Sequence, residues 1–141
     1  MPVVRSRRGG AAKIPYEIEI TDHVHLTWTG ELTCDTVRSA LQAIFQHTAF
    51  RKGMAIVSQN CPPNYNPSAD ELRSVANEWL RLKERIGPVA VVVEQDVHVG
   101  LFSMLRAYCQ VEGLRIEVFR NMDEALVWIG KDGNVFDLPQ T

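Results

Sequence analysis

Acidic and imidazole side chains cluster just after the apolar run Val89 to Val93, where Glu94, Asp96 and His98 follow within five positions. A carboxylate beside an imidazole orients the ring and raises its pKa, which suits acid–base catalysis. The plainer interpretation is a set of polar residues lining a turn before a helix, and we favour it. A small enzyme using Asp96 and His98 therefore stays an alternative hypothesis, and no residue is assigned as catalytic.

The stretch from Ser58 to Pro67 is the strongest candidate for a binding loop. It is rich in proline and carries the neutral hydrogen-bonding residues Asn60, Asn64, Tyr65 and Asn66. Loops at the carboxyl ends of parallel strands are where α/β proteins bind ligands. Because this loop has no acid or base of its own, it favours recognition over catalysis. The predicted binding residues are Asn60, Tyr65, Asn66, Ser68, Asp96 and His98.

Ser68 opens the sequence Ser-Ala-Asp-Glu, which fits a capping box at a helix start. A phosphate at this serine would be favoured by the helix dipole. The adjacent acids Asp70 and Glu71 would repel that phosphate, and the reciprocal cap between Ser68 and Glu71 already explains both residues. We expect the cap and keep a phosphorylation switch as an alternative.

Metal and thiol chemistry receive little support. His23 and His25 share one face of a predicted strand, which is the geometry for two ligands of one metal, but no third ligand is evident. The three cysteines are Cys34, Cys61 and Cys109. They are odd in number and widely spaced, so neither a disulfide framework nor a zinc site is expected. No metal or cofactor is predicted, and Cys61 is not expected to be a reactive thiol.

Composition indicates one ordinary globular domain. The chain has 141 residues, of which 45% are hydrophobic and 23% charged. No apolar run reaches the roughly 18 residues of a membrane span, so we expect a cytoplasmic protein with no membrane segment. The first 13 residues hold four of the 15 basic residues and none of the 17 acids. We expect residues 1–15 to form a solvated basic tail, without nucleic-acid binding.

Hydrophobic periodicity predicts the element order ββαβαβαβα over residues 16–130, followed by a C-terminal tail over 131–141. The first two strands, Tyr16 to Ile20 and His23 to Thr29, should form an antiparallel hairpin. The strand at 89–93 lacks alternation, which indicates burial on both faces of a parallel sheet. The fold class is therefore α/β, with a mixed, mostly parallel sheet packed against helices. Expected strands follow at 54–57, 89–93 and 114–119.

Each predicted helix carries an apolar stripe toward the sheet. Thr33 should cap the first helix, which Arg51, Lys52 and Gly53 should close. Gln95 to Gly100 should be a loop, and the third helix should face inward through Leu101, Met104, Leu105, Tyr108 and Val111. Asn121 should cap the last helix, which ends at Gly130 and packs through Met122, Ala125, Leu126 and Ile129.

The closing segment 116–129, Ile-Glu-Val-Phe-Arg-Asn-Met-Asp-Glu-Ala-Leu-Val-Trp-Ile, resembles that of stand-alone bacterial SpoIIAA-like proteins of the STAS superfamily. The resemblance spans about residues 16–130, and only this ending is distinctive. It implies a STAS-like fold and a regulatory role, because such domains bind partner proteins and some accommodate nucleotides or apolar ligands. The antagonists of anti-sigma factors carry a phosphorylated serine in an Asp-Ser-Ser/Thr-Gly motif, which this chain lacks after Val57.

The main functional hypothesis is accordingly a non-catalytic module that regulates or binds, acting through the loops after the third and fourth strands. Its expected partner is another protein or a small apolar or nucleotide ligand. A homodimer is a further possibility, formed if the edge strand Tyr16 to Ile20 pairs across a two-fold axis.

Overall fold

The computed structural model of the chain describes residues 3–4 and 14–133. Within these residues, six strands form one sheet in the sequential order β1-β2-β3-β4-β5-β6. The first two pairings are antiparallel and the remaining three are parallel. The elements are β1 (Val3–Val4), β2 (Tyr16–Ile20), β3 (Val24–Trp28), α1 (Cys34–Gln46), β4 (Ile56–Gln59), α2 (Ala69–Leu80), β5 (Val89–Val92), α3 (Asp96–Val111), β6 (Ile116–Phe119) and α4 (Met122–Gly133).

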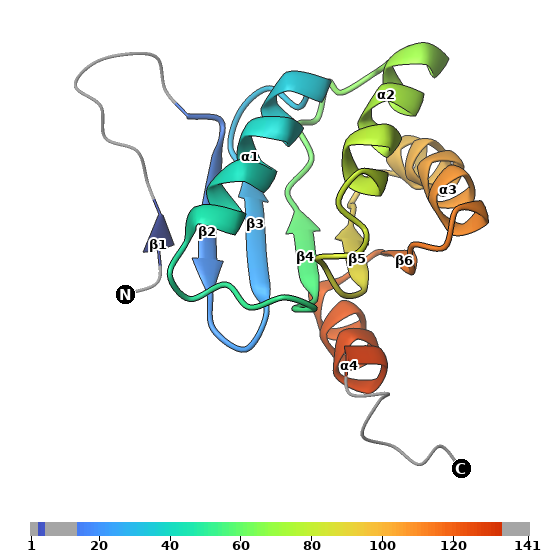
Figure 1. The fold of residues 1–141 in the computed structure, drawn as a ribbon. Helices are drawn as coiled ribbons and strands as arrows, with labels where there is room; N and C mark the ends of the chain where they lie inside the picture. The colour runs from blue at the N-terminus through green and yellow to red at the C-terminus, as the bar shows by residue number, and fades with distance from the viewer. Residues whose placement is uncertain (1–2, 5–13, 134–141) are drawn as a thin grey trace.

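The three connecting helices cover one face of the sheet and α4 covers part of the other. Figure 1 shows α1 and α2 side by side over the strands, with α3 beyond α2. The main core lies between these helices and the sheet. A smaller core forms on the opposite face, where Ala125 and Ile129 of α4 pack on Ala55, Val57, Ala90 and Val92. Burial of both faces of β5 confirms the prediction from its unbroken apolar sequence.

The predicted order ββαβαβαβα is observed from Tyr16 onward, and the α/β class is confirmed. One additional strand precedes it, because Val3 and Val4 pair with Glu19 and Ile18 of β2. Two residues are too short a run for periodicity to detect, and the open edge of β2 supplies the backbone partners. The basic residues of the tail lie outside the described residues. So does the C-terminal tail beyond Gly133, whereas α4 runs three residues past its predicted end at Gly130.

The edge strand assigned to a homodimer is not a free edge in this structure. β1 takes the pairing positions opposite Ile18 and Glu19 on the outer side of β2. A two-fold pairing of β2 with its copy would therefore have to displace β1.

Two helix boundaries differ from their predictions. α1 ends at Gln46, with His47 as its C-cap, so Arg51 to Gly53 belong to the turn that leads into β4. Gly53 does adopt a positive φ of 89°, but in this turn and not at the helix end. α3 begins at Asp96, so most of the expected loop from Gln95 to Gly100 is helical.

The inward face of α3 also differs from its prediction. Its buried residues are His98, Phe102, Leu105 and Cys109. Of the expected stripe only Leu105 is buried, and Met104 and Val111 are exposed. The helix carries two apolar stripes, and periodicity alone does not tell which of them meets the sheet. On α4 the same ambiguity leaves Leu126 exposed.

No helix in the described part of the chain combines the length and the apolar character needed to cross a membrane.

Candidate functional site

A cavity of about 200 Å³ lies at the carboxyl ends of β3, β4 and β5, which we call the carboxyl-edge cavity. Its walls come from the residues just after these strands: Trp28 to Gly30, Asn60 to Pro63, and Val92 with Glu94, Gln95 and His98. Parallel strands place their carboxyl ends at one edge, so three loops converge there. The predicted loops after the third and fourth strands of the ββαβαβαβα pattern therefore do meet at one hollow.

The shape of the cavity wall depends on Trp28 and Asn60. The Trp28 indole Nε1 donates to Ser58 Oγ at 3.1 Å, and the Asn60 amide nitrogen donates to the Trp28 carbonyl at 2.8 Å. Asn60 has a φ of 71°, the left-handed region that asparagine tolerates better than most residues. These contacts turn the chain sharply out of β4 and tie it to the end of β3. The Asn60 side chain thus positions the loop.

His98 is buried in the first turn of α3, not exposed in a loop, with a side chain only 1% accessible. Its Nε2 donates to the Tyr65 carbonyl at 3.1 Å. The Tyr65 ring stacks on Phe102 with ring centroids 5.7 Å apart. His98 therefore connects the proline-rich loop to α3, and its hydrogen bond requires the proton on Nε2.

Asp96 and His98 are not brought together as an acid–base pair. The Asp96 carboxylate accepts from the Arg120 guanidinium at 2.8 Å, and the same guanidinium donates to the Glu94 carbonyl at 2.9 Å. These contacts join the loop before α3 to the end of β6. Asp96 is absent from the cavity wall, whereas Glu94 contributes to it. The geometry required by the enzyme hypothesis is not assembled in this structure.

Cys61 is the thiol that lines the carboxyl-edge cavity. Burial raises its pKa to about 12. Only a very small fraction is then the nucleophilic thiolate near neutral pH. The arrangement does not favour covalent catalysis at Cys61.

Two other predicted binding residues, Tyr65 and Asn66, lie at a second hollow. Asn64, Tyr65 and Asn66 line this hollow of about 190 Å³, next to Thr33 and Glu71. Among the described residues the buried Tyr65 hydroxyl has no hydrogen-bond partner, and burial raises its pKa. The predicted set of six residues is thus divided: Asn60 and His98 belong to the carboxyl-edge cavity, and Tyr65 and Asn66 to the second hollow.

Ser68 forms the predicted capping box. Its Oγ accepts from the Glu71 backbone N–H at 3.1 Å, and the Glu71 carboxylate accepts from the Ser68 N–H at 3.2 Å. Phosphorylation of Ser68 would disturb its hydroxyl group and the neighbouring Glu71 carboxylate. Both groups already stabilise the start of α2.

His23 and His25 lie on the same face, with ring centroids 6.3 Å apart. His23 contacts Asp22 through Nδ1 at 3.1 Å, and His25 Nε2 contacts the Gln59 side chain. No group of three potential metal ligands occurs in the part of the chain that the structure describes.

Sequence reasoning missed the largest cavity side chain, Trp28. Its position at the end of a strand that pairs in parallel with β4 is a usable signal. It also missed Glu78, a buried acid on the side of α2 that faces α1. A buried acid indicates an ion pair.

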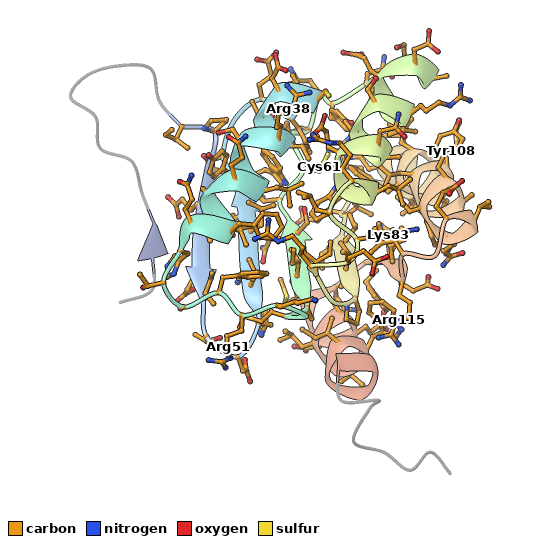
Figure 2. The ribbon with its side chains drawn as sticks, in the orientation of Figure 1. Arg38, Arg51, Cys61, Lys83, Tyr108 and Arg115 are labelled. Carbon is orange, nitrogen blue, oxygen red and sulfur yellow. The ribbon has the colours of Figure 1, made fainter. Side chains whose placement is uncertain are left out.

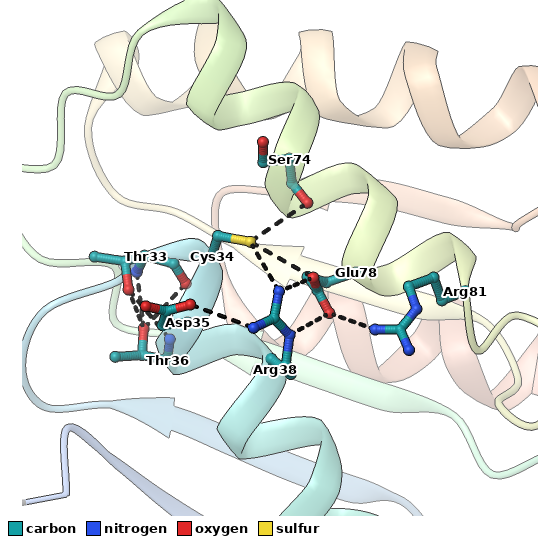
Figure 3. A network of polar contacts seen from close by, with 8 residues as sticks. All are labelled: Thr33, Cys34, Asp35, Thr36, Arg38, Ser74, Glu78 and Arg81. Carbon is teal, nitrogen blue, oxygen red and sulfur yellow. Dashed lines mark hydrogen bonds and ion pairs between the residues drawn. The ribbon is translucent and has the colours of Figure 1, made fainter.

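Glu78 is the centre of a polar network between α1 and α2 (Figure 3). Arg38 donates to its two carboxylate oxygens at 2.7 and 3.3 Å, and Arg81 donates at 3.2 Å. The Cys34 thiol donates to the same carboxylate at 3.5 Å. Hydrogen bonds from Arg38 hold the pKa of Glu78 below its usual value, although burial opposes the shift. The network joins the two helices across their polar side.

We expect the Glu78→Gln variant to lose about 1–3 kcal/mol of unfolding free energy at neutral pH, because charged hydrogen bonds of this kind contribute that much. The lowered pKa in the folded state means that ionised Glu78 stabilises the protein above the unfolded pKa near 4.5. That contribution is lost as the pH falls through the folded pKa. Urea unfolding can be followed by circular dichroism from pH 7 to pH 3. The free energy of unfolding should fall less with decreasing pH in the variant than in the original chain.

Glu84→Gln is the matched control, because Glu84 follows α2 and is exposed. The free energy of unfolding of this variant should depend on pH in the same way as that of the original chain. Equal pH dependence in all three proteins would contradict the assigned role of Glu78.

No known family model matches the chain, and the searches of characterised proteins and of solved structures found no match either.

Proposed function

We propose that the protein is a non-catalytic regulatory module that binds a small uncharged ligand in the carboxyl-edge cavity. The observation that carries the proposal is the lining: hydrogen-bonding groups beside Trp28 and two prolines, with Glu94 as the acidic residue and no lysine or arginine. A preformed hollow that combines apolar walls with placed polar groups is the usual form of a ligand site. The resemblance of residues 116–129 to SpoIIAA-like STAS proteins supports a regulatory role.

The lining also restricts the class of ligand. Glu94 is its acidic residue, and no cation is there to balance a phosphate or carboxylate. The cavity has a volume of about 200 Å³, which has room for one heteroaromatic ring. A nucleobase-sized ring, free or at the end of a larger molecule, fits these limits.

The two alternatives have less support. Catalysis by Asp96 and His98 lacks the necessary contact, because Asp96 pairs with Arg120 and His98 with the Tyr65 carbonyl. A phosphorylation switch would have to disrupt the capping box of Ser68.

Ligand binding can be tested by saturation-transfer NMR with adenine, nicotinamide, indole and AMP as separate probes. We expect saturation of at least one uncharged ring and a weaker signal from AMP, since its phosphate meets no cation. Gln95→Trp should abolish the signal, because Gln95 lies at the cavity wall and its side chain makes no capping hydrogen bond.

Gln42→Trp, at an exposed position of α1, is the matched control and should leave the signal unchanged. Saturation of none of the uncharged rings, or equal binding by the Gln95→Trp variant, would refute the proposal.

A further inference from the structure

The outward face of α3 is apolar along its whole length and uncovered in the single chain. Val97 is 60% exposed, Met104 43% and Val111 82%. Leu101 and Tyr108 lie between them and are partly exposed. These five positions are spaced 4, 3, 4 and 3 apart, which is the repeat of a helix–helix seam. We call them the α3 seam.

Among the residues of α3 itself, the margin of the seam is also free of charge; from α2, the Arg73 guanidinium lies over the Tyr108 ring, 5.1 Å from its centroid. Gly100 and Ala107 lie beside it at exposed positions, and a Cβ added at Gly100 would meet nothing within 4 Å. At 3.6 residues per turn, the seam and these two residues span an arc of about 120° without a charged side chain. An ordinary surface helix is polar on the side opposite its core stripe. Since the side of α3 that faces the core is also apolar, the polar residues of this helix lie mainly on one flank.

The residue pattern selects a second copy of this chain as the occupant. It is symmetric about Met104: apolar residues occur three and four positions away on both sides, and Val97 and Val111 lie seven positions away. In an antiparallel pair with a two-fold axis at Met104, Val97 of one copy meets Val111 of the other. Gly100 and Leu101 of one copy lie at the level of Ala107 and Tyr108 of its partner. A two-fold interface requires such a self-complementary patch.

The charges on the neighbouring helix agree with an antiparallel pair. α2 runs in the same direction as α3, because both connect parallel strands. Its first turn carries Asp70 and Glu71, and its far end is followed by Lys83 and by Arg81, which is paired with Glu78. Lys83 and Tyr108 lie on the same side of the molecule, along the groove between α2 and α3 (Figure 2). Antiparallel pairing places the cationic end of one α2 toward the acidic end of the other, whereas parallel pairing would bring like charges together.

We propose that the protein forms a homodimer through an antiparallel α3–α3 contact centred on Met104. The surface is distinct from the edge strand β2 and from the carboxyl-edge cavity. The same contact covers the largest exposed apolar side chains of α3, which explains why the helix has a second apolar stripe.

Light scattering after size exclusion tests the proposal with the full-length chain at increasing micromolar concentrations. We expect a mass of about twice 15.9 kDa for the original protein. Met104→Lys places two like charges at the axis and should raise the dissociation constant at least about tenfold. Val127→Lys is the matched control, because Val127 of α4 is equally apolar and 60% exposed, and it should remain dimeric.

A mixing experiment tests the antiparallel register. Val97→Glu and Val111→Lys should each weaken the dimer, and an equimolar mixture should recover it, since opposite charges then face each other. Ala107→Glu, also at an exposed position, repeats the Met104 test if that variant does not give a native circular dichroism spectrum. A monomer at every concentration, or dissociation by Val127→Lys but not by Met104→Lys and Ala107→Glu, would overturn the proposal. Two weakened variants that do not recover on mixing would overturn the antiparallel register.

Discussion

The Trp28→Ala variant is expected to lose about 3–5 kcal/mol of unfolding free energy, the usual cost of truncating a fully packed tryptophan. Trp28 is only 2% exposed at the end of β3. Its indole packs edge-on against Tyr16 with ring centroids 5.9 Å apart, and its Nε1 donates to Ser58. Truncation leaves a void in the main core and a buried hydroxyl without its donor.

Urea unfolding followed by circular dichroism measures this effect without relying on tryptophan fluorescence. Trp28→Phe separates the two causes, because it keeps most of the ring and removes only the indole donor. It should lose about 1–2 kcal/mol. Trp128→Ala is the matched control: Trp128 is half-buried in the smaller core, so its loss should be clearly less. A Trp28→Ala protein within 1 kcal/mol of the original would contradict the packing described for β3.

Gly87→Ala is expected to cost about 3 kcal/mol, at the upper end of the usual range for overpacking. A Cβ at Gly87 would lie 2.3 Å from the Gly53 carbonyl oxygen and 3.1 Å from the Met54 carbonyl carbon. Both obstacles are backbone, so no side chain can rotate away. The Gly87 N–H donates to the Met54 carbonyl at 2.8 Å, and the Gly53 N–H donates to the Arg85 carbonyl at 2.9 Å. The added methyl group must therefore spread the two turns that lead into β4 and β5.

Gly130→Ala is the control for this substitution. A Cβ at Gly130 meets nothing within 4 Å, and its position in α4 gains helix propensity from alanine. We expect a change of up to about 1 kcal/mol toward greater stability. A thermal melt of the two variants beside the original chain should give shifts of opposite sign. A Gly87→Ala protein as stable as Gly130→Ala would show that the two turns are not held as closely as described.

Structural features that depend on neighbouring residues can be predicted from this sequence more reliably than the direction in which a helix face points. The caps at Thr33 and Ser68 were predicted because a cap depends on residues three positions apart. The burial of β5 followed from its unbroken apolar run. The prediction of the inward face of α3 is wrong because the helix has two apolar stripes, and only packing against the sheet decides which of them is buried. His98 was placed in a loop because its polar neighbours resemble a turn, whereas its hydrogen bond to Tyr65 connects residues 33 positions apart.

The sequence points to the two loops after the third and fourth predicted strands, but not to the side chains that line the hollow between them. The convergence of the two loops followed from strand order, a general property of parallel sheets. Which side chains reach the hollow depends on the left-handed turn at Asn60 and on the ion pair that draws Asp96 toward Arg120. Neither is readable from spacing, because each depends on the three-dimensional path of the chain.

The position of α4 has a consequence for the chain during synthesis. The smaller core closes only when Ala125 and Ile129 reach the exposed face of β4 and β5. Because strands that are neighbours in the sheet are also neighbours in the sequence, β2 through β5 can pair with one another before α4 has been synthesised. During that interval Val57, Ala90 and Val92 face water as an apolar patch that can bind chaperones or other nascent chains. Packing of α4 is thus the step that removes this apolar patch from water.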